Sequence, residues 1–167
     1  IQCIVNSQIR KDGKLTVWCQ QHHFETLEPI QARAYEFPSF TAEGETADLV
    51  ELLMGVKNPS PAVMNAIESA VEWLRNQAIK GYRHEYYKAA DGKWDRRLVP
   101  DANAPLLWAR NYDLETEQPY FGDRDGKKHA TYAEISRERR MGYKWIGNDV
   151  QRVLDKYPAW YTKYHPG

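Results

Sequence analysis

The chain has 167 residues, and its 23 Lys and Arg are balanced by 23 Asp and Glu, so the formal net charge is zero with histidine neutral. This length is typical of one domain, and 42% hydrophobic with 28% charged residues is the composition of a folded globular protein. Zero net charge argues against general nucleic-acid binding, which depends on excess positive charge. The apolar runs are too short for a membrane-spanning helix. We therefore expect neither a nucleic-acid nor a membrane partner.

Apolar residues at helical spacing predict three helices in the first half of the chain. They lie over residues 1–9, 49–56 and 60–81. The third has the clearest ends, because Ser60 is a suitable N-cap and Gly81 suits a left-handed stop. The first predicted helix resembles the last turns of a longer helix, which predicts that the chain begins inside a fold. The alternative is an ordinary first helix with a frayed end.

Further along the chain, short strands and two more helix starts are predicted. Residues 15–19 and 108–112 have the pattern of short strands. Residues 131–134 and 148–151 have the form of a capping box, which marks the start of a helix. No linker rich in Gly, Ser or Pro divides the chain. We therefore predict a single domain over residues 1–167 that is mainly α, with long loops and a few short β-strands.

Common catalytic and metal-binding motifs are absent, including the phosphate-binding glycine loop, the dinucleotide fingerprint and the Gly-x-Ser-x-Gly elbow. The adjacent pair His22–His23 would point in different directions, which favours structural or supporting roles. Cys3 and Cys19 allow one disulfide and lack the spacing of a zinc site. Residues 123–126 lack the other ligands of a calcium loop and are interpreted as a turn presenting an arginine. The basic run at 137–140 is interpreted as a solvated helix face.

Three arginines in aromatic or acidic surroundings remain as candidates for chemistry: Arg33, Arg110 and Arg124. A guanidinium group is a planar fork that binds a carboxylate through two hydrogen bonds, and neighbouring rings can cover the apolar face of a sugar. These sites therefore suit carboxylate-bearing sugars. The competing interpretation pairs each arginine with a local acid, such as Arg33 with Glu36 and Arg124 with a flanking aspartate, and needs no ligand.

Several short segments, read in chain order, carry a family pattern. They include Ala-Arg-Ala-Tyr-Glu at 32–36, Leu-Trp-Ala-Arg-Asn-Tyr at 107–112 and Phe-Gly-Asp-Arg-Asp-Gly at 121–126, together with residues 6–9, 13–22 and 138–143. In this order they resemble the pectate lyases of polysaccharide lyase family 10. The resemblance spans nearly the whole chain and implies that the fold is part of an (α/α) toroid with a central groove.

The resemblance implies calcium-dependent anti β-elimination on polygalacturonate, the acidic polysaccharide of pectin. Arg33 matches the family base, which takes the C5 proton next to the uronate carboxylate. Arg110 and Arg124 match family arginines that bind substrate carboxylates. Trp108 and Tyr112 alternate with Arg110 in sequence and are expected to line the same substrate site. Because the pKa of a free arginine is above about 12, a base role requires positive charge nearby, from calcium and from the other two arginines.

The resemblance covers only the C-terminal half of the family's catalytic module, whose calcium-binding aspartates lie in the N-terminal half. The expectation is therefore a fragment, one member of a split pair with a complementary N-terminal segment, or a shortened homologue. Residues 37–45 also depart from the family pattern by one extra residue. Secretion or a periplasmic location is expected from the substrate and not from a signal peptide.

Two other functions stay open from the sequence alone. One is a non-catalytic pectin-binding domain that keeps the arginines and aromatic residues but lacks the metal-binding half. The other is a glycoside hydrolase, which needs an acid and a base carboxyl group at a defined separation. The hydrolase is disfavoured because the acids near the motifs all have arginine neighbours.

Overall fold

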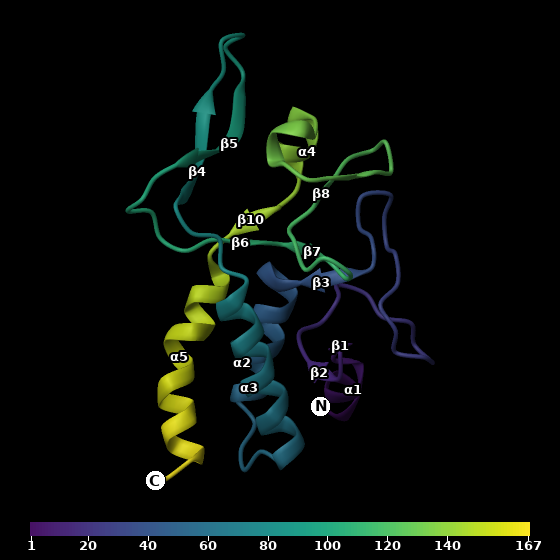
Figure 1. Cartoon of the computed structure of the whole chain (residues 1–167), viewed down its shortest axis with the longest axis vertical. Coiled ribbons are helices and arrows are strands. Elements are labelled where there is room, and N and C mark those ends of the chain that lie inside the picture. The colour runs from purple at the N-terminus through teal and green to yellow at the C-terminus, as the bar shows by residue number, and fades with distance from the viewer.

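The long helices and most of the strands lie at opposite ends of the computed structural model, which describes all of residues 1–167 (Figure 1). Helices α2 (Ala47–Met54), α3 (Pro61–Asn76) and α5 (Asp149–Tyr164) run side by side at one end. Short strands, loops and the small helix α4 (Arg137–Gly142) make up the other end. The candidate site residues are therefore carried mainly by loops above a helical layer.

The fold class predicted from the sequence is wrong. The chain is 36% helix and 22% strand, with five α-helices and five two-stranded antiparallel sheets, so it is a mixed α and β structure and not clearly an (α/α) toroid. Polar residues and two-residue strands conceal this strand content from any search for periodicity. The paired strands are β1 (Arg10–Lys11) with β2 (Lys14–Leu15), β3 (Ser39–Thr41) with β7 (Asn111–Asp113), β4 (Tyr82–Lys88) with β5 (Trp94–Pro100), β6 (Trp108–Ala109) with β10 (Ile146–Gly147), and β8 (Phe121–Gly122) with β9 (Lys128–His129).

Helix α3 confirms the clearest prediction from the sequence. The Ser60 hydroxyl accepts a hydrogen bond from the Val63 N–H at 3.3 Å and caps the helix. The predicted apolar face is buried, from Val63 to Leu74. The helix ends at Asn76 rather than at Gly81, because the chain beyond it pairs in an extended form with residue 107.

The remaining predicted helices have mixed outcomes. Helix α2 confirms the prediction at 49–56, and a short helix, α1 (Gln2–Ser7), lies within the first predicted segment. Helix α5 starts where the second capping box places it. The first capping box yields only one 3-10 turn, η2 (Tyr132–Glu134), because Thr131 donates its hydroxyl to the Glu134 carboxylate and caps no backbone N–H.

Two separate hydrophobic cores organise these elements. The larger has 20 buried residues, drawn mostly from α2, α3 and α5, and includes Trp108 and Tyr112. The smaller has eight: Tyr35, Leu107, Phe121, Tyr132, Ile135, Tyr143, Trp145 and Ile146. No helix is both long and apolar enough to cross a bilayer. Both cysteines are free thiols, with Cys3 exposed and Cys19 buried.

Candidate functional site

Arg33, Arg110 and Arg124 gather around two tyrosines of the smaller core. The rings of Tyr35 and Tyr143 meet edge to face, with their centres 5.3 Å apart. Arg33 bonds to the hydroxyl of Tyr35, and Arg110 stacks on Tyr143. Arg124 is linked to Tyr35 through an ion-paired chain of side chains. We call these three arginines and two tyrosines the arginine cluster.

Arg33 projects from a tight loop in which the Glu36 N–H donates to the carbonyl of Arg33 at 2.9 Å. Its side chain is 65% exposed and lies 3.7 Å from the carboxylate of Glu36, so the local pairing considered from the sequence is present. Its Nη1 donates to the Tyr35 hydroxyl at 3.0 Å. This hydrogen bond, followed by the charge of Glu36, raises the pKa of Arg33. The guanidinium is therefore held in its charged form.

Arg110 occupies a bend between β6 and β7. Its N–H donates to the carbonyl of Trp145 at 2.7 Å, and its carbonyl accepts from Ala42 at 2.8 Å, so the backbone is fixed on both sides. The guanidinium lies 4.7 Å from the ring centre of Tyr143 and forms an ion pair with Glu45. Its buried Nε has no hydrogen-bond partner. One donor of this arginine is therefore uncommitted.

Arg124 extends from the turn predicted at 123–126. Two of its nitrogens bind the carboxylate of Glu138 at 2.7–2.9 Å, in place of the flanking aspartates considered from the sequence. These bonds from Arg124, followed by one from Arg139, lower the pKa of Glu138 to about 2. The Arg139 guanidinium lies 4.9 Å from the ring centre of Tyr35 and completes the chain of contacts. The Arg124 side chain remains 63% exposed.

Comparisons with known proteins identify the family of this chain. A sequence profile of the family described as pectic acid lyase matches residues 1–154. The chain belongs to the pectic acid lyase family. A search of curated proteins gave no match.

Two solved structures have a fold similar to that of this chain. One is the family 10 polysaccharide lyase from Cellvibrio cellulosa, with a TM-score of 0.81 and 31% sequence identity. The other is a mutant of that enzyme in complex with trigalacturonic acid, with the same score and identity. Each match covers 94% of this chain but only 47–48% of the solved chain. This member of the pectic acid lyase family thus spans about half the length of those structures.

Trp108 and Tyr112 do not belong to the exposed site in this family member. They are 0% and 1% exposed and pack in the larger core. Trp108 donates its indole N–H to the carbonyl of Leu74 at 2.7 Å, and Tyr112 donates its hydroxyl to the carbonyl of Gln77 at 2.9 Å. The expected shared face fails because the chain bends at Arg110, which interrupts the strand alternation. Neither ring reaches a ligand on the surface.

The sequence reasoning missed the partners that hold the arginine cluster together. The missed side chains are Tyr35, Glu45, Glu138, Arg139 and Tyr143. Several lie inside the motifs that carry the family resemblance, which was the available signal. The basic run at 137–140 is not a solvated face, since Arg139 is buried and its neighbours are ion-paired. Gly122 allows close contact with Tyr35, because an added Cβ would lie 2.5 Å from the Tyr35 carbonyl oxygen.

The residues of this chain do not form a calcium site by themselves. No group of three or more His, Cys, Asp or Glu side chains is placed to hold a metal ion. The carboxylates at the arginine cluster are already engaged, Glu36 by Tyr143 and Glu45 and Glu138 by arginines. Calcium prefers six to eight oxygen ligands. The side chains at the arginine cluster therefore do not fit a calcium ion on their own.

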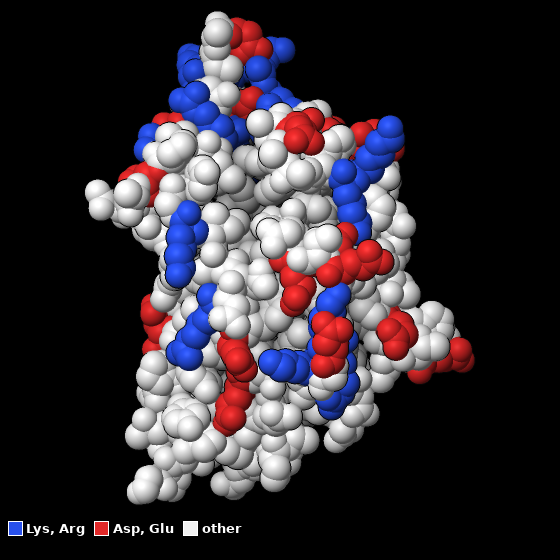
Figure 2. Space-filling view, viewed as in Figure 1, with Lys and Arg blue, Asp and Glu red and all other residues white.

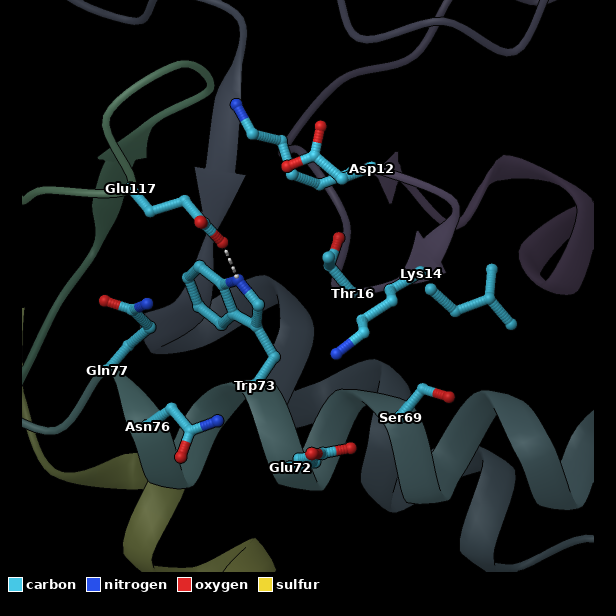
Figure 3. A pocket seen from close by; sticks show the side chains of 11 residues that line it. Asp12, Lys14, Thr16, Ser69, Glu72, Trp73, Asn76, Gln77 and Glu117 are labelled. Carbon is cyan, nitrogen blue, oxygen red and sulfur yellow. Dashed lines mark hydrogen bonds between the residues drawn. The ribbon is translucent and has the colours of Figure 1, made fainter.

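A cavity of about 360 Å³ lies away from the cluster, between the β1–β2 hairpin and α3 (Figure 3). The indole N–H of Trp73 donates to Glu117 at 2.9 Å across it. Its rim mixes cations with anions, such as Lys14 with Glu72, and contains none of the arginines predicted to bind substrate. The arginine cluster, by contrast, includes two side chains that are largely exposed, Arg33 and Arg124.

Proposed function

We propose that this chain carries the arginines that bind and deprotonate the uronate in a pectate lyase reaction. The observation that supports this most directly is the meeting of Arg33, Arg110 and Arg124 around Tyr35 and Tyr143. Family membership supports the same reaction. Trigalacturonic acid, the ligand of the Cellvibrio cellulosa enzyme mutant, has the carboxylates that guanidinium groups recognise.

In this proposal Arg110 and Arg124 bind uronate carboxylates. Both now hold protein carboxylates, Glu45 and Glu138, in geometry that a substrate carboxylate can reproduce. The pair between Arg124 and Glu138 is exposed on both sides, and exposed pairs contribute only about 0–1 kcal/mol. A uronate can therefore replace Glu138 at little cost.

Arg33 is the proposed base. The neutral guanidine takes the C5 proton, and the C5–H electron pair forms the C4=C5 double bond. The C4–O electron pair leaves with the oxygen, which takes a proton from solvent water. Tyr35 and Glu36 oppose this step in the free chain because they raise the pKa of Arg33. Turnover thus requires Arg33 to leave these partners for surroundings with more positive charge. We propose calcium dependence on this ground, with calcium ligands that the side chains of this chain do not provide by themselves.

The lyase proposal is tested by following the ultraviolet absorbance of the unsaturated product from polygalacturonate, with calcium and with a chelator. We expect product with calcium, and its loss by at least about a hundredfold in Arg33→Ala, as expected for a general base. Arg10→Ala is the matched control, since Arg10 is an exposed arginine on β1. Full activity of Arg33→Ala would remove Arg33 from the base role, and saturated products would point to hydrolysis.

A second candidate is binding of pectate without turnover. It is favoured by the lack of a metal-binding group and by the raised pKa of Arg33. Calorimetry with trigalacturonate separates the two candidates, because binding without product supports this one. Both predict weaker binding in Arg110→Ala and Arg124→Ala, and an unchanged affinity in both variants would contradict both. Either activity acts on an extracellular polymer, so we keep secretion or a periplasmic location as part of the proposal.

A further inference from the structure

The β4–β5 hairpin carries two exposed aromatic rings stacked on one another. Tyr86 and Trp94 have ring centres 4.7 Å apart and planes only 6° from parallel, yet they are 56% and 49% exposed. The guanidinium of Arg96 lies 6.0 Å from the ring centre of Tyr86. Tyr86 and Arg96 are paired across the two strands, so these side chains share one face of the hairpin. We call Tyr86, Trp94 and Arg96 the hairpin platform.

The charges of the hairpin leave this face positive. Its three carboxylates are all bound by arginines: Glu85 by Arg97, and Asp91 and Asp95 by residues of α4. The cations Lys88, Lys93 and Arg96, in contrast, have no carboxylate within ion-pair distance. Figure 2 shows Lys and Arg side chains gathered over the end of the molecule from which the hairpin projects. A ligand of this face is therefore expected to be anionic.

A hollow beside the platform provides room for part of such a ligand. Its volume is about 370 Å³, and Tyr86 and Arg96 form part of its lining together with His84, Lys144 and Ile146. Arg96 donates one long hydrogen bond, of 3.4 Å, to the carbonyl of Arg140 and has other donors available. Burial of His84, followed by the charge of Arg96, lowers the pKa of the histidine. Lys144 is already ion-paired with Glu43 and Asp149, so Arg96 is the cation of the hollow without a carboxylate partner.

We propose that the hairpin platform is a second, non-catalytic binding site for uronate chains. A carboxylate in the hollow pairs with Arg96, and the sugars that follow cover the rings of Tyr86 and Trp94. Aromatic rings offer apolar faces and edges to sugars, while a guanidinium fork selects a carboxylate over a neutral group. The choice of uronate as the anion rests on the proposed function. The site would hold a long polymer on the protein between cleavage events.

Trp94 provides a direct readout of this site. It is the one exposed tryptophan, since the other five are 7% exposed or less. Quenching of tryptophan fluorescence by acrylamide therefore reports mainly on Trp94. We expect oligogalacturonate to reduce this quenching in the Arg33→Ala chain, which binds without cleaving under the lyase proposal. Trp94→Phe should show no ligand-dependent reduction of quenching. Arg96→Ala should need at least about tenfold more oligogalacturonate for the same reduction.

Controls separate this inference from the proposed function and from other ligands. Tyr161→Ala removes an exposed ring of α5. In this variant oligogalacturonate should reduce the quenching of Trp94 as much as it does in the chain with Tyr161. Fully methyl-esterified oligogalacturonate should give no protection if the carboxylate is required. If oligogalacturonate protects Trp94 in the parent chain but no unsaturated product forms, the platform proposal is supported and the lyase proposal is contradicted. Product without protection, or protection by single-stranded RNA instead of oligogalacturonate, would overturn the platform as a uronate site.

Discussion

The two cores of this chain are stabilised by different means. The larger core is a layer of helices with 20 buried aliphatic and aromatic side chains. The smaller core has eight buried residues, five of them aromatic, packed under loops, and arginines stack on two of its rings. A small apolar cluster buries too little surface to hold loops by itself.

The ion pairs around the smaller core compensate for its size. Arg140 binds Asp95 through two nitrogens at 2.8–2.9 Å, and Arg139 binds Glu138 at 2.9 Å. The candidate binding arginines lie in this region and not over the helices. One set of ion pairs therefore has two roles in our interpretation. Glu138, for example, is bound both by the buried Arg139 and by Arg124, a candidate binding arginine. The following predictions test whether the two regions really depend on different forces.

The largest effect is expected at Asp95, beside the smaller core. Its side chain is only 5% exposed, and Arg140 and Arg137 both face it. Asp95→Asn leaves a largely buried guanidinium without its charge partner, and we expect a loss of about 3–5 kcal/mol in the free energy of unfolding. Urea unfolding at pH 7 measures this. A loss below about 1 kcal/mol would show that this pair is not needed for the region.

The same residue predicts how stability depends on pH. The hydrogen bonds from Arg140 lower the pKa of Asp95 to about 2 in the folded chain, against about 3.9 when unfolded. Because the folded pKa is the lower one, the stabilisation is complete above pH 4 or so and is lost as the pH falls toward about 2. The difference between the parent chain and Asp95→Asn should therefore shrink over that interval. A constant difference down to pH 2.5 or so would contradict the assignment.

A comparable loss with a different signature is expected in the larger core. Leu74 on α3 is fully buried, and Leu74→Ala should cost about 2–5 kcal/mol. Because no charge is involved, the cost should stay the same in 1 M or so sodium chloride and between pH 7 and about 4. Leu52→Ala is the control, since Leu52 on α2 is 54% exposed and its loss should be within about 0.5 kcal/mol. Strong salt dependence of Leu74→Ala would remove the distinction between the two cores.

Sequence patterns predicted the helical region better than the loop region for a physical reason. The apolar face of α3 follows from neighbours three or four residues apart, and α5 starts at the capping box predicted at residues 148–151. The N-terminus of α5 nevertheless receives its cap from elsewhere, because the buried carboxylate of Glu43 accepts the N–H groups of Asp149 at 2.7 Å and Val150 at 3.3 Å. A cap supplied across more than a hundred residues leaves no local signal.

The candidate site shows the same division. The motifs predicted one site for Arg33, Arg110 and Arg124, and these side chains do lie around the same two tyrosines. Their roles in the reaction remain predictions. The hairpin β4–β5 left little signal, because both of its faces mix charged and aromatic residues and so lack simple alternation. Its seven cross-strand pairs are evident only in three dimensions.

The smallest effect is expected at Ser136, the N-cap of α4, and Thr131, the residue before η2, provides the comparison. Ser136 accepts a hydrogen bond from the N–H of Arg139 at 3.4 Å and donates its hydroxyl to Asp123 at 3.1 Å. Thr131 caps no backbone N–H, although its spacing from Glu134 matches the sequence rule. We expect Ser136→Ala to cost about 1 kcal/mol and Thr131→Ala less than about 0.5 kcal/mol.

The link to Asp123 gives Ser136→Ala a second consequence. Asp123 begins the turn that presents Arg124, so removing the hydroxyl uncaps the helix and also leaves the turn held by the Ser136 N–H alone of the two bonds from Ser136 to Asp123. Hydrogen exchange should therefore rise at Arg139 and within residues 123–126 together, while α3 stays protected. Equal losses in the two variants, or exchange confined to α4, would show that the turn holding Arg124 is positioned independently of the helix.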